Sequence, residues 1–246
     1  MPDLLPAIDL RDNAVVRLYQ GDYDRQTTYG HDPLAQAKAF EAEGATWLHV
    51  VDLDGARTGN ATHLETIRGI CAGTSLKVEV GGGVRDTGAI DALLDAGVHR
   101  VVLGTAALRD WSWFESLLSG GRYDGRLVLG LDARGGKVAA AGWEEPTELT
   151  AVELAGRVRG STLAAIVYTD IATDGTLEGP NVEATAEMCD ATDVPVVASG
   201  GVGTLDHLRA LRPLPISGVI VGRALYDGVF NVTEALGALE GEVARG

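Results

Sequence analysis

The sequence is poor in the residues that build disulfide scaffolds and metal-binding modules. Its 246 residues include two cysteines, Cys71 and Cys189, and five histidines. Both cysteines stand in alanine-rich helical sequence without the close spacing of zinc ligands, and no grouping of His, Asp and Glu suggests a metal site. We therefore predict two buried or half-buried free thiols and no bound metal.

Long apolar runs and positive charge are also scarce. No stretch approaches the roughly 20 apolar residues of a membrane span, and the start, MPDLLPAIDL, lacks the basic region and cleavage pattern of a signal peptide. The formal net charge is −15, and lysine is nearly absent beside arginine. We therefore expect a cytoplasmic protein with neither nucleic acid nor membrane as a partner. Local groups would have to hold any anionic ligand.

What the sequence has in quantity is short runs of Val, Ile and Leu that alternate with helical segments. Such runs are typical of parallel strands that are buried on both faces. The predicted strands are Leu4–Asp9, Trp47–Leu53, Leu76–Val80, Arg100–Leu103, Arg126–Asp132, Ala164–Asp170, Val194–Ser199 and Gly218–Val221. The predicted helices include Pro33–Glu43, Thr87–Ala96, Ala151–Arg159 and Leu205–Leu211. This order predicts an α/β fold, a single (β/α)8 TIM barrel domain over residues 1–246.

The two halves of the chain repeat each other at one offset of 118 residues. VEVGGGVRD at 78–86 matches VVASGGVGT at 196–204, and VVDLDG at 50–55 matches YTDIATDG at 168–175. The two cysteines obey the same offset. We predict an internal two-fold repeat of half-barrels, roughly 1–122 and 123–246. The cysteines should then lie on opposite sides, beyond the about 7 Å between Cα atoms that a disulfide allows.

Each half also begins with a strand that ends in an aspartate. A turn at 12–13 follows Asp9, and a turn at 135–136 follows Asp132, so we expect a hairpin at the barrel mouth in each half. Two carboxylates that face each other across a closed mouth suit general acid and general base catalysis. The catalytic candidates are Asp9, Asp132, Thr169 and Asp174, of which the last two add hydrogen bonds or a proton.

Glycine-rich turns follow four of the predicted strands. In a barrel, the carboxyl ends of the strands form the active face, and the loops after strands seven and eight form the usual phosphate site. Glycines let backbone N–H groups approach an anion. Although any one turn alone could be an ordinary connection, the repeat predicts a second site opposite the first, and hence a bisphosphorylated substrate. The predicted phosphate-binding residues are Gly81, Gly82, Gly83, Gly104, Thr105, Gly175, Ser199, Gly200, Gly201, Gly222 and Arg223.

Other polar residues have simpler interpretations. Asp52 and Asp170 are expected to cap helices or to form ion pairs in loops. His49 lies inside a strand, where we expect a packed or hydrogen-bonded side chain. The remaining histidines are expected on the surface or in loops, at His31, His63, His99 and His207. No G-x-S-x-G segment offers a serine nucleophile.

Several of these segments together resemble the histidine-biosynthesis isomerase family. They are PAIDL, VVRLYQGDY, HVVDLDGA, VGGGVR, GLDARGG, GW, TDIATDGTLEGPN, ASGGV and GVIVGRALY. The resemblance extends from Leu5 to about Phe230. Members convert phosphoribosylformimino-aminoimidazole carboxamide ribotide (ProFAR) to its ribulosyl form. The resemblance therefore implies an Amadori rearrangement, an aldose-to-ketose isomerisation that uses no cofactor.

The resemblance also implies roles for the aspartates at the mouth. The family's base matches Asp9 and its acid matches Asp132, whereas some accounts of the family give the acid role to the residue that matches Asp174. Thr169 matches a residue that assists.

The implied substrate-binding residues are Arg17, Gly21, His49, Arg85 and Trp143. Among them, Arg17, Arg85 and Trp143 match positions in or under mobile loops that close over the substrate and exclude water. Hydrophobic packing explains Trp143 equally well.

Two relatives share much of this pattern. The cyclase subunit of imidazole glycerol phosphate synthase has the same repeat but typically a Cys before its first Leu-Asp and a Lys in place of Arg17, so PAID at 6–9 favours the isomerase. An actinobacterial bifunctional phosphoribosyl isomerase also acts on phosphoribosylanthranilate in tryptophan biosynthesis. That form usually has Ser-Gly-Gly where this chain has three glycines at 81–83, and the second activity stays an alternative.

We predict a monomeric ProFAR isomerase. An alternative from another class is a non-catalytic phosphoribosyl-binding barrel with a regulatory role. The presence of both Asp9 and Asp132 favours the enzyme.

Overall fold

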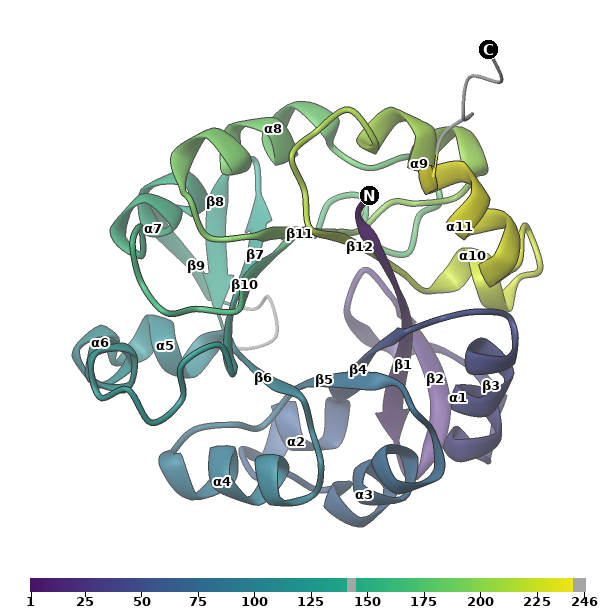
Figure 1. Cartoon of the computed structure of the whole chain (residues 1–246), viewed down its shortest axis with the longest axis horizontal. Coiled ribbons are helices and arrows are strands. Elements are labelled where there is room, and N and C mark those ends of the chain that lie inside the picture. The colour runs from purple at the N-terminus through teal and green to yellow at the C-terminus, as the bar shows by residue number, and fades with distance from the viewer. Residues whose placement is uncertain (141–144, 241–246) are drawn as a thin grey trace.

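Eight parallel strands form a closed barrel in the computed structural model, which describes residues 1–140 and 145–240 (Figure 1). Around the barrel they are β1 (Asp3–Arg11), β4 (Trp47–Asp52), β5 (Lys77–Gly81), β6 (Arg100–Leu103), β7 (Leu127–Arg134), β10 (Ala165–Asp170), β11 (Val196–Ser199) and β12 (Gly218–Val221). Pairing of β12 with β1 and of β7 with β10 closes the ring. The predicted (β/α)8 barrel is thereby confirmed, and each predicted strand ends within two residues of its observed bounds.

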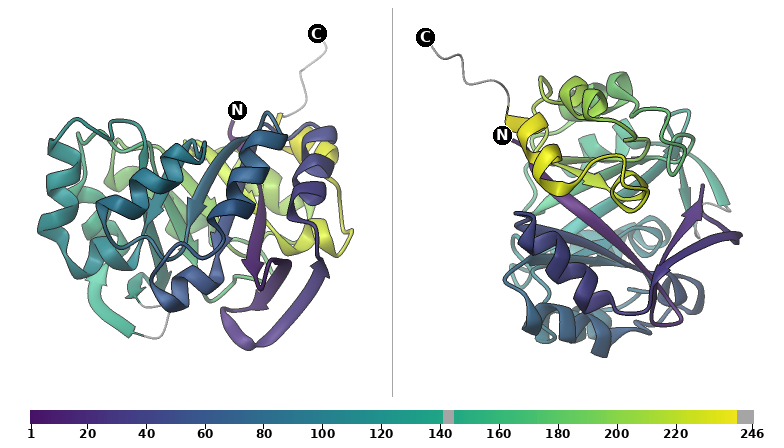
Figure 2. Two further views of the ribbon diagram at one scale, coloured as in Figure 1. Left: turned by 90° about the horizontal axis from the view of Figure 1, so that it is seen from below. Right: turned by 90° about the vertical axis from the view of Figure 1, so that its right-hand side faces the viewer.

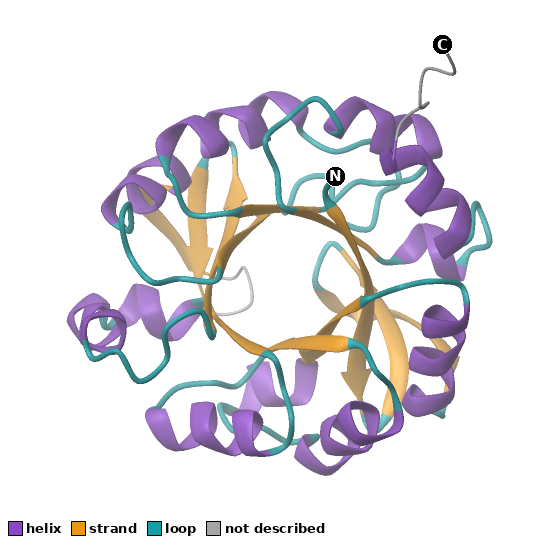
Figure 3. Cartoon of the chain, in the orientation of Figure 1, coloured by secondary structure: helices purple, strands orange, loops and turns teal. Residues whose placement is uncertain are grey.

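Helices cover the outside of the barrel, as Figures 1 and 3 show. They are α1 (Pro33–Ala42), α2 (Leu53–Thr58), α3 (Leu64–Gly73), α4 (Thr87–Asp95), α5 (Thr105–Arg109), α6 (Trp111–Ser119), α7 (Ala151–Arg157), α8 (Val182–Ala191), α9 (Leu205–Leu211), α10 (Arg223–Tyr226) and α11 (Val232–Glu240). Side chains of Asp32, Asp86 and Asn181 accept hydrogen bonds from the first turns of α1, α4 and α8. Such caps satisfy backbone N–H groups that have no partner within the helix. No helix among the described residues is long and apolar enough to span a membrane.

Both expected hairpins project from the same end of the barrel (Figure 2, left). Strands β2 (Ala14–Tyr19) and β3 (Asp22–Gly30) follow β1, and β8 (Lys137–Ala140) and β9 (Glu145–Thr150) follow β7. Both residues of each tight turn have positive φ, at 51° and 58° for Asp12 and Asn13 and at 57° and 80° for Gly135 and Gly136. Positive φ at both positions is the geometry that two-residue hairpins require.

Apolar side chains fill two separate spaces. One group packs between the strands and the helices, and includes Leu103, Ile67 and Phe114, each 0% exposed. The other group fills the inside of the barrel and consists of Leu5, Ala7, Trp47, Val128, Ala165, Val167, Val197 and Ile220. The interior is therefore a packed core, and the space for a ligand lies above it at the strand ends.

The repeat seen in the sequence recurs in the backbone. Gly82 and Gly200 have φ of 99° and 97°, and Gly83 and Gly201 have φ of 76° and 80°. Cys71 and Cys189 are half-buried free thiols on α3 and α8, as predicted. The boundary near residue 122 and the assignment of the whole chain to one domain stay predictions.

Candidate active site

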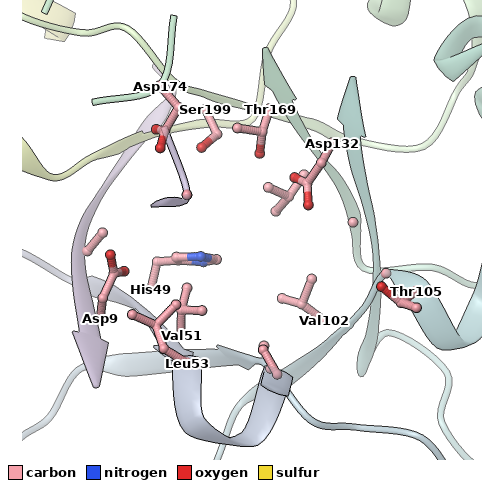
Figure 4. Close-up of a pocket in the computed structure, with 18 of the residues that line it drawn as sticks. Asp9, His49, Val51, Leu53, Val102, Thr105, Asp132, Thr169, Asp174 and Ser199 are labelled. Atoms are coloured by element: carbon pink, nitrogen blue, oxygen red, sulfur yellow. The ribbon is translucent and has the colours of Figure 1, made fainter. Parts of the chain in front are cut away.

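A cavity of about 1030 Å³ opens at the carboxyl ends of the barrel strands. This volume lies at the upper end of the range for small-molecule sites. Every candidate residue from the sequence lines the cavity, except Trp143, which lies outside the described residues. Figure 4 shows Asp9 on one side of this pocket and Asp132 on the opposite side, with Asp174, Ser199 and Thr169 along the rim. The predicted carboxylates and glycine turns therefore share one site.

The glycine turns after β5 and β11 leave no room for side chains. A Cβ atom at Gly82 would collide with the carbonyl oxygen of Asp52, and one at Gly201 would collide with the carbonyl oxygen of Gly179. Their positive φ values add a second reason for glycine. In both halves the backbone can therefore approach a ligand closely.

The turns after β6 and β12 are equally matched. Gly104 is the N-cap residue of α5, with φ −107° and ψ −97°, and Gly222 is the N-cap residue of α10, with φ −117° and ψ −93°. Thr105 and Arg223 are the first residues of these helices. Arg223 also donates from Nη1 to the carbonyl oxygen of Gly175 at 2.6 Å, which ties the loop after β10 to this turn.

Asp9 is paired with Arg17 at the edge of the cavity. The Arg17 Nη1 atom donates to Asp9 Oδ2 at 2.7 Å, and both side chains are less than a fifth exposed. The guanidinium lies directly over Gly222, where a Cβ atom would overlap it. Its Nε atom is buried without a hydrogen-bond partner. One arginine therefore touches the candidate base and the candidate phosphate turn, with a donor left over for a ligand.

The carboxyl group of Asp174 has a raised pKa. Burial, the largest influence, and the carboxylates of Asp9 and Asp132 together raise the pKa of Asp174 to about 6, against the opposing charge of Arg17. A carboxyl group with a pKa in this range can hold and release a proton near neutral pH. Thr169 pairs with Asp132 in the sheet register, so the hydroxyl-bearing residue neighbours Asp132, the other candidate acid.

The remaining polar predictions also have clear outcomes. Asp52 is the N-cap of α2, as expected, and accepts hydrogen bonds from the backbone N–H groups of Gly55, Thr62 and His63. Asp170 instead accepts hydrogen bonds from the Ala172 backbone and the Asn181 side chain, which hold the loop after β10. His49 is buried and hydrogen-bonded through Nδ1 to Glu79, as the sequence indicated, while its ring also reaches the cavity.

His63 lies in the loop before α3, which is one of the two expected places, but its side chain is buried. It is 4% exposed, with Nε2 2.9 Å from Asp54 Oδ2 and Nδ1 3.1 Å from Asn13 Oδ1. The turn at Asn13, which is 50 residues away in sequence, covers the ring. Local sequence carries no sign of this long-range contact.

Several cavity residues were not anticipated from the sequence. They are polar or aromatic and include Arg57, Arg109, Asp110 and Trp113. All four follow shortly after a barrel strand, in the segments that form the active face of this fold. Their position after the strand ends is the signal that could have found them.

Comparison with known proteins shows extensive similarity. The model of the histidine biosynthesis protein family matches residues 3–231. A protein from Synechococcus sp. is 52% identical over 96% of this chain and 93% of its own length, and one from Dinoroseobacter shibae is 47% identical over 96% and 98%. Each is named 1-(5-phosphoribosyl)-5-((5-phosphoribosylamino)methylideneamino)imidazole-4-carboxamide isomerase, as is a protein from Rhodopseudomonas palustris that is 48% identical. This chain belongs to the histidine biosynthesis protein family.

Proposed function

We infer that the chain isomerises ProFAR to its phosphoribulosyl form in histidine biosynthesis. The relatives named for this reaction align over nearly the whole chain. The observation that carries the proposal is the arrangement of the cavity, in which matched glycine turns flank a set of carboxyl groups. A substrate with a phosphate at each end fits such a site, because backbone N–H groups at each turn can bind one phosphate.

The rearrangement needs an acid that protonates the ring oxygen of one sugar and a base that removes the proton from C2 of the same sugar. The acid protonates the ring oxygen, the C1–O bond breaks, and the lone pair of the attached nitrogen forms a C1=N double bond. The base then takes the proton from C2, the C–H electrons form C1=C2, and the C=N electrons return to nitrogen. Finally, the C2 hydroxyl loses its proton, C2=O forms, and C1 gains a proton. Reactant and product have the same atoms and electrons, so proton transfer alone accomplishes the change.

We assign the base to Asp9. Its ion pair with Arg17 holds the side chain in place at the cavity wall. For the acid, the raised pKa favours Asp174, because a group with a pKa of about 6 still carries a proton in part of the molecules near neutral pH. Asp132 is the alternative acid, with Thr169 as its hydroxyl neighbour.

We assign one phosphate to the turns after β5 and β6 and the other to the turns after β11 and β12. The Arg17 guanidinium is suited to the second phosphate, since it lies over Gly222 and lines the cavity. Arg85, which lies over Gly59 at the end of α2, borders the first. The same proposal makes the protein a monomeric, single-domain enzyme. Action in the cytoplasm is part of the same proposal.

Steady-state assays of the purified protein test the proposal. We expect turnover of ProFAR, and expect a rate about 10²- to 10⁴-fold lower with Asp9→Asn. Asp206→Asn is a matched control, because Asp206 pairs with Arg209 on an exposed helix face and should leave the rate unchanged. Phosphoribosylanthranilate serves as the second substrate, and turnover of both compounds would establish the bifunctional alternative. Turnover of neither would overturn the assignment.

A further inference from the structure

A chain of three polar side chains crosses the inside of the barrel beneath the cavity. His49, Glu79 and Arg100 occupy neighbouring strands, and the sheet register pairs His49 with Glu79 and Glu79 with Arg100. Glu79 is 0% exposed, Arg100 is 8% exposed and His49 is 9% exposed. This row of three side chains therefore runs from the packed interior to the floor of the cavity, where His49 is its last member.

Both carboxylate oxygens of Glu79 are occupied. Oε1 lies 2.5 Å from His49 Nδ1, and Oε2 accepts from Arg100 Nε at 2.6 Å. The Arg100 guanidinium in turn stacks on Trp47, 4.1 Å from the ring centroid. Burial alone would raise the pKa of Glu79, but the hydrogen bonds from His49 and Arg100 and the charge of Arg100 outweigh burial and lower it. Glu79 is therefore a carboxylate, locked between two partners.

The second half of the barrel shows that packing does not require these charges. At the offset of 118 residues, His49, Glu79 and Arg100 correspond to Val167, Val197 and Gly218. The register is the same, with Val167 paired to Val197 and Val197 to Gly218. The two valines belong to the apolar cluster that fills the barrel. Buried ion pairs are often no better for stability than apolar side chains of similar volume. A polar chain in one half alone therefore points to function.

We propose that Glu79, anchored by Arg100, is a positioning residue that holds His49 as the neutral Nδ1–H tautomer with its Nε2 lone pair facing the substrate. A carboxylate accepts but cannot donate, so the proton of a neutral His49 must sit on Nδ1. The Nε2 atom has no hydrogen-bond partner among the described residues, and Figure 4 shows the ring reaching toward the middle of the pocket. There it accepts a hydrogen bond from a sugar hydroxyl. That substrate contact rests on the proposed isomerase function, whereas the tautomer does not.

Glu79→Gln reverses the tautomer in a way that the geometry dictates. Arg100 can only donate, so the new amide must turn its oxygen toward Arg100 and its NH2 group toward His49. Nδ1 must then accept, and the imidazole proton moves to Nε2. Nε2 of His49 would then present a hydrogen-bond donor to the substrate hydroxyl, where the wild-type protein presents an acceptor.

Nitrogen-15 NMR of the imidazole rings of the intact protein at pH 8 reads the tautomer directly. We expect a protonated Nδ1 and an unprotonated Nε2 at His49 in the wild-type protein, and the opposite in Glu79→Gln. A wild-type ring that is protonated on Nε2, alone or together with Nδ1, would overturn the proposal. This measurement needs no turnover, so it stands apart from any failure of the proposed function.

Kinetics with ProFAR then test the effect on the site. We expect Glu79→Gln to lower kcat/KM by about 10- to 100-fold. This is the usual effect of removing a carboxylate that hydrogen-bonds to a metal-binding histidine and orients it. Adding Arg100→Met frees the amide to turn its oxygen back to His49, so the double variant should recover part of the loss and the wild-type tautomer. Asp91→Asn, which breaks an ion pair between Asp91 on α4 and Arg122 in the turn after α6, is the control and should keep the wild-type rate. If the double variant has the same rate and the same His49 tautomer as Glu79→Gln, the three side chains have a purely structural role.

Discussion

Replacement of Asp174 by Asn should remove a defined part of the pH dependence of stability. The pKa of Asp174 is about 6 in the folded protein, against an ordinary value of 3.8. The folded chain therefore binds this proton more tightly than the unfolded chain does. Stability from this group is fully present below about pH 4, is lost as the pH rises through about 6, and is flat above about pH 7.

The size of the effect follows from the shift. At about 1.4 kcal/mol per pH unit, a shift of roughly two units corresponds to about 3 kcal/mol. About half of this change falls above pH 5, and it corresponds to about 3–5 °C in Tm for a chain of this size. These are upper values, because the side chain is partly exposed and solvent screens it.

Thermal and urea unfolding of wild type and Asp174→Asn between pH 5 and pH 8 measure the difference. The variant cannot ionise at this position, so we expect it to gain stability relative to wild type as the pH rises to about 7. Asp206→Asn, on an exposed helix face, should show a constant difference from wild type across the same range. A constant difference for Asp174→Asn as well would refute the raised pKa and, with it, the reason to prefer Asp174 as the acid.

Three further substitutions test the site and the core. Asp9→Asn should lower kcat about 10²- to 10⁴-fold, measured by steady-state kinetics, while calorimetry still detects substrate binding; loss of binding would contradict the base assignment. Gly201→Ala should raise KM and lower Tm, because the new Cβ would collide with the carbonyl oxygen of Gly179 and because φ at this position is +80°. Gly237→Ala, in open space on α11, should instead stabilise the protein by up to about 1 kcal/mol. Equal effects of the two substitutions would refute the steric argument. Phe114→Ala should cost about 3–5 kcal/mol in urea unfolding, because the ring is fully buried, and a loss below 1 kcal/mol would be inconsistent with that packing.

Strands that are buried on both faces were the most predictable part of the fold. Runs such as Val101 to Leu103 are apolar throughout and stand out from the helices around them. Strand β3 was not predicted, because most of its residues are exposed and it lacks the alternation of a half-buried strand. Its strand conformation comes from pairing with β2 rather than from its own composition.

The candidate site was predictable to the extent that it is symmetric. The repeat identified the glycine turns and the two aspartates, since each feature occurs twice at a fixed offset or in matched hairpins. Among features present in one half alone, Thr169 and Asp174 were foreseen, whereas the polar contacts of Glu79 were not. Glu79 and Arg100 read as ordinary strand residues, and only the barrel register brings them together beneath His49. The burial of His63 likewise depends on a hairpin turn that is distant in sequence.

The central claim is that carboxyl groups at one barrel mouth shift a proton between adjacent carbons of a substrate whose phosphates lie in two matched turns. The most direct measurement is proton NMR of ProFAR mixed with the purified protein, which follows the C2 proton of the reacting sugar. The account predicts that this signal disappears as the ribulosyl product forms, and that it persists with Asp9→Asn. Persistence of the signal with the wild-type protein, or its loss at the wild-type rate with Asp9→Asn, would contradict the account.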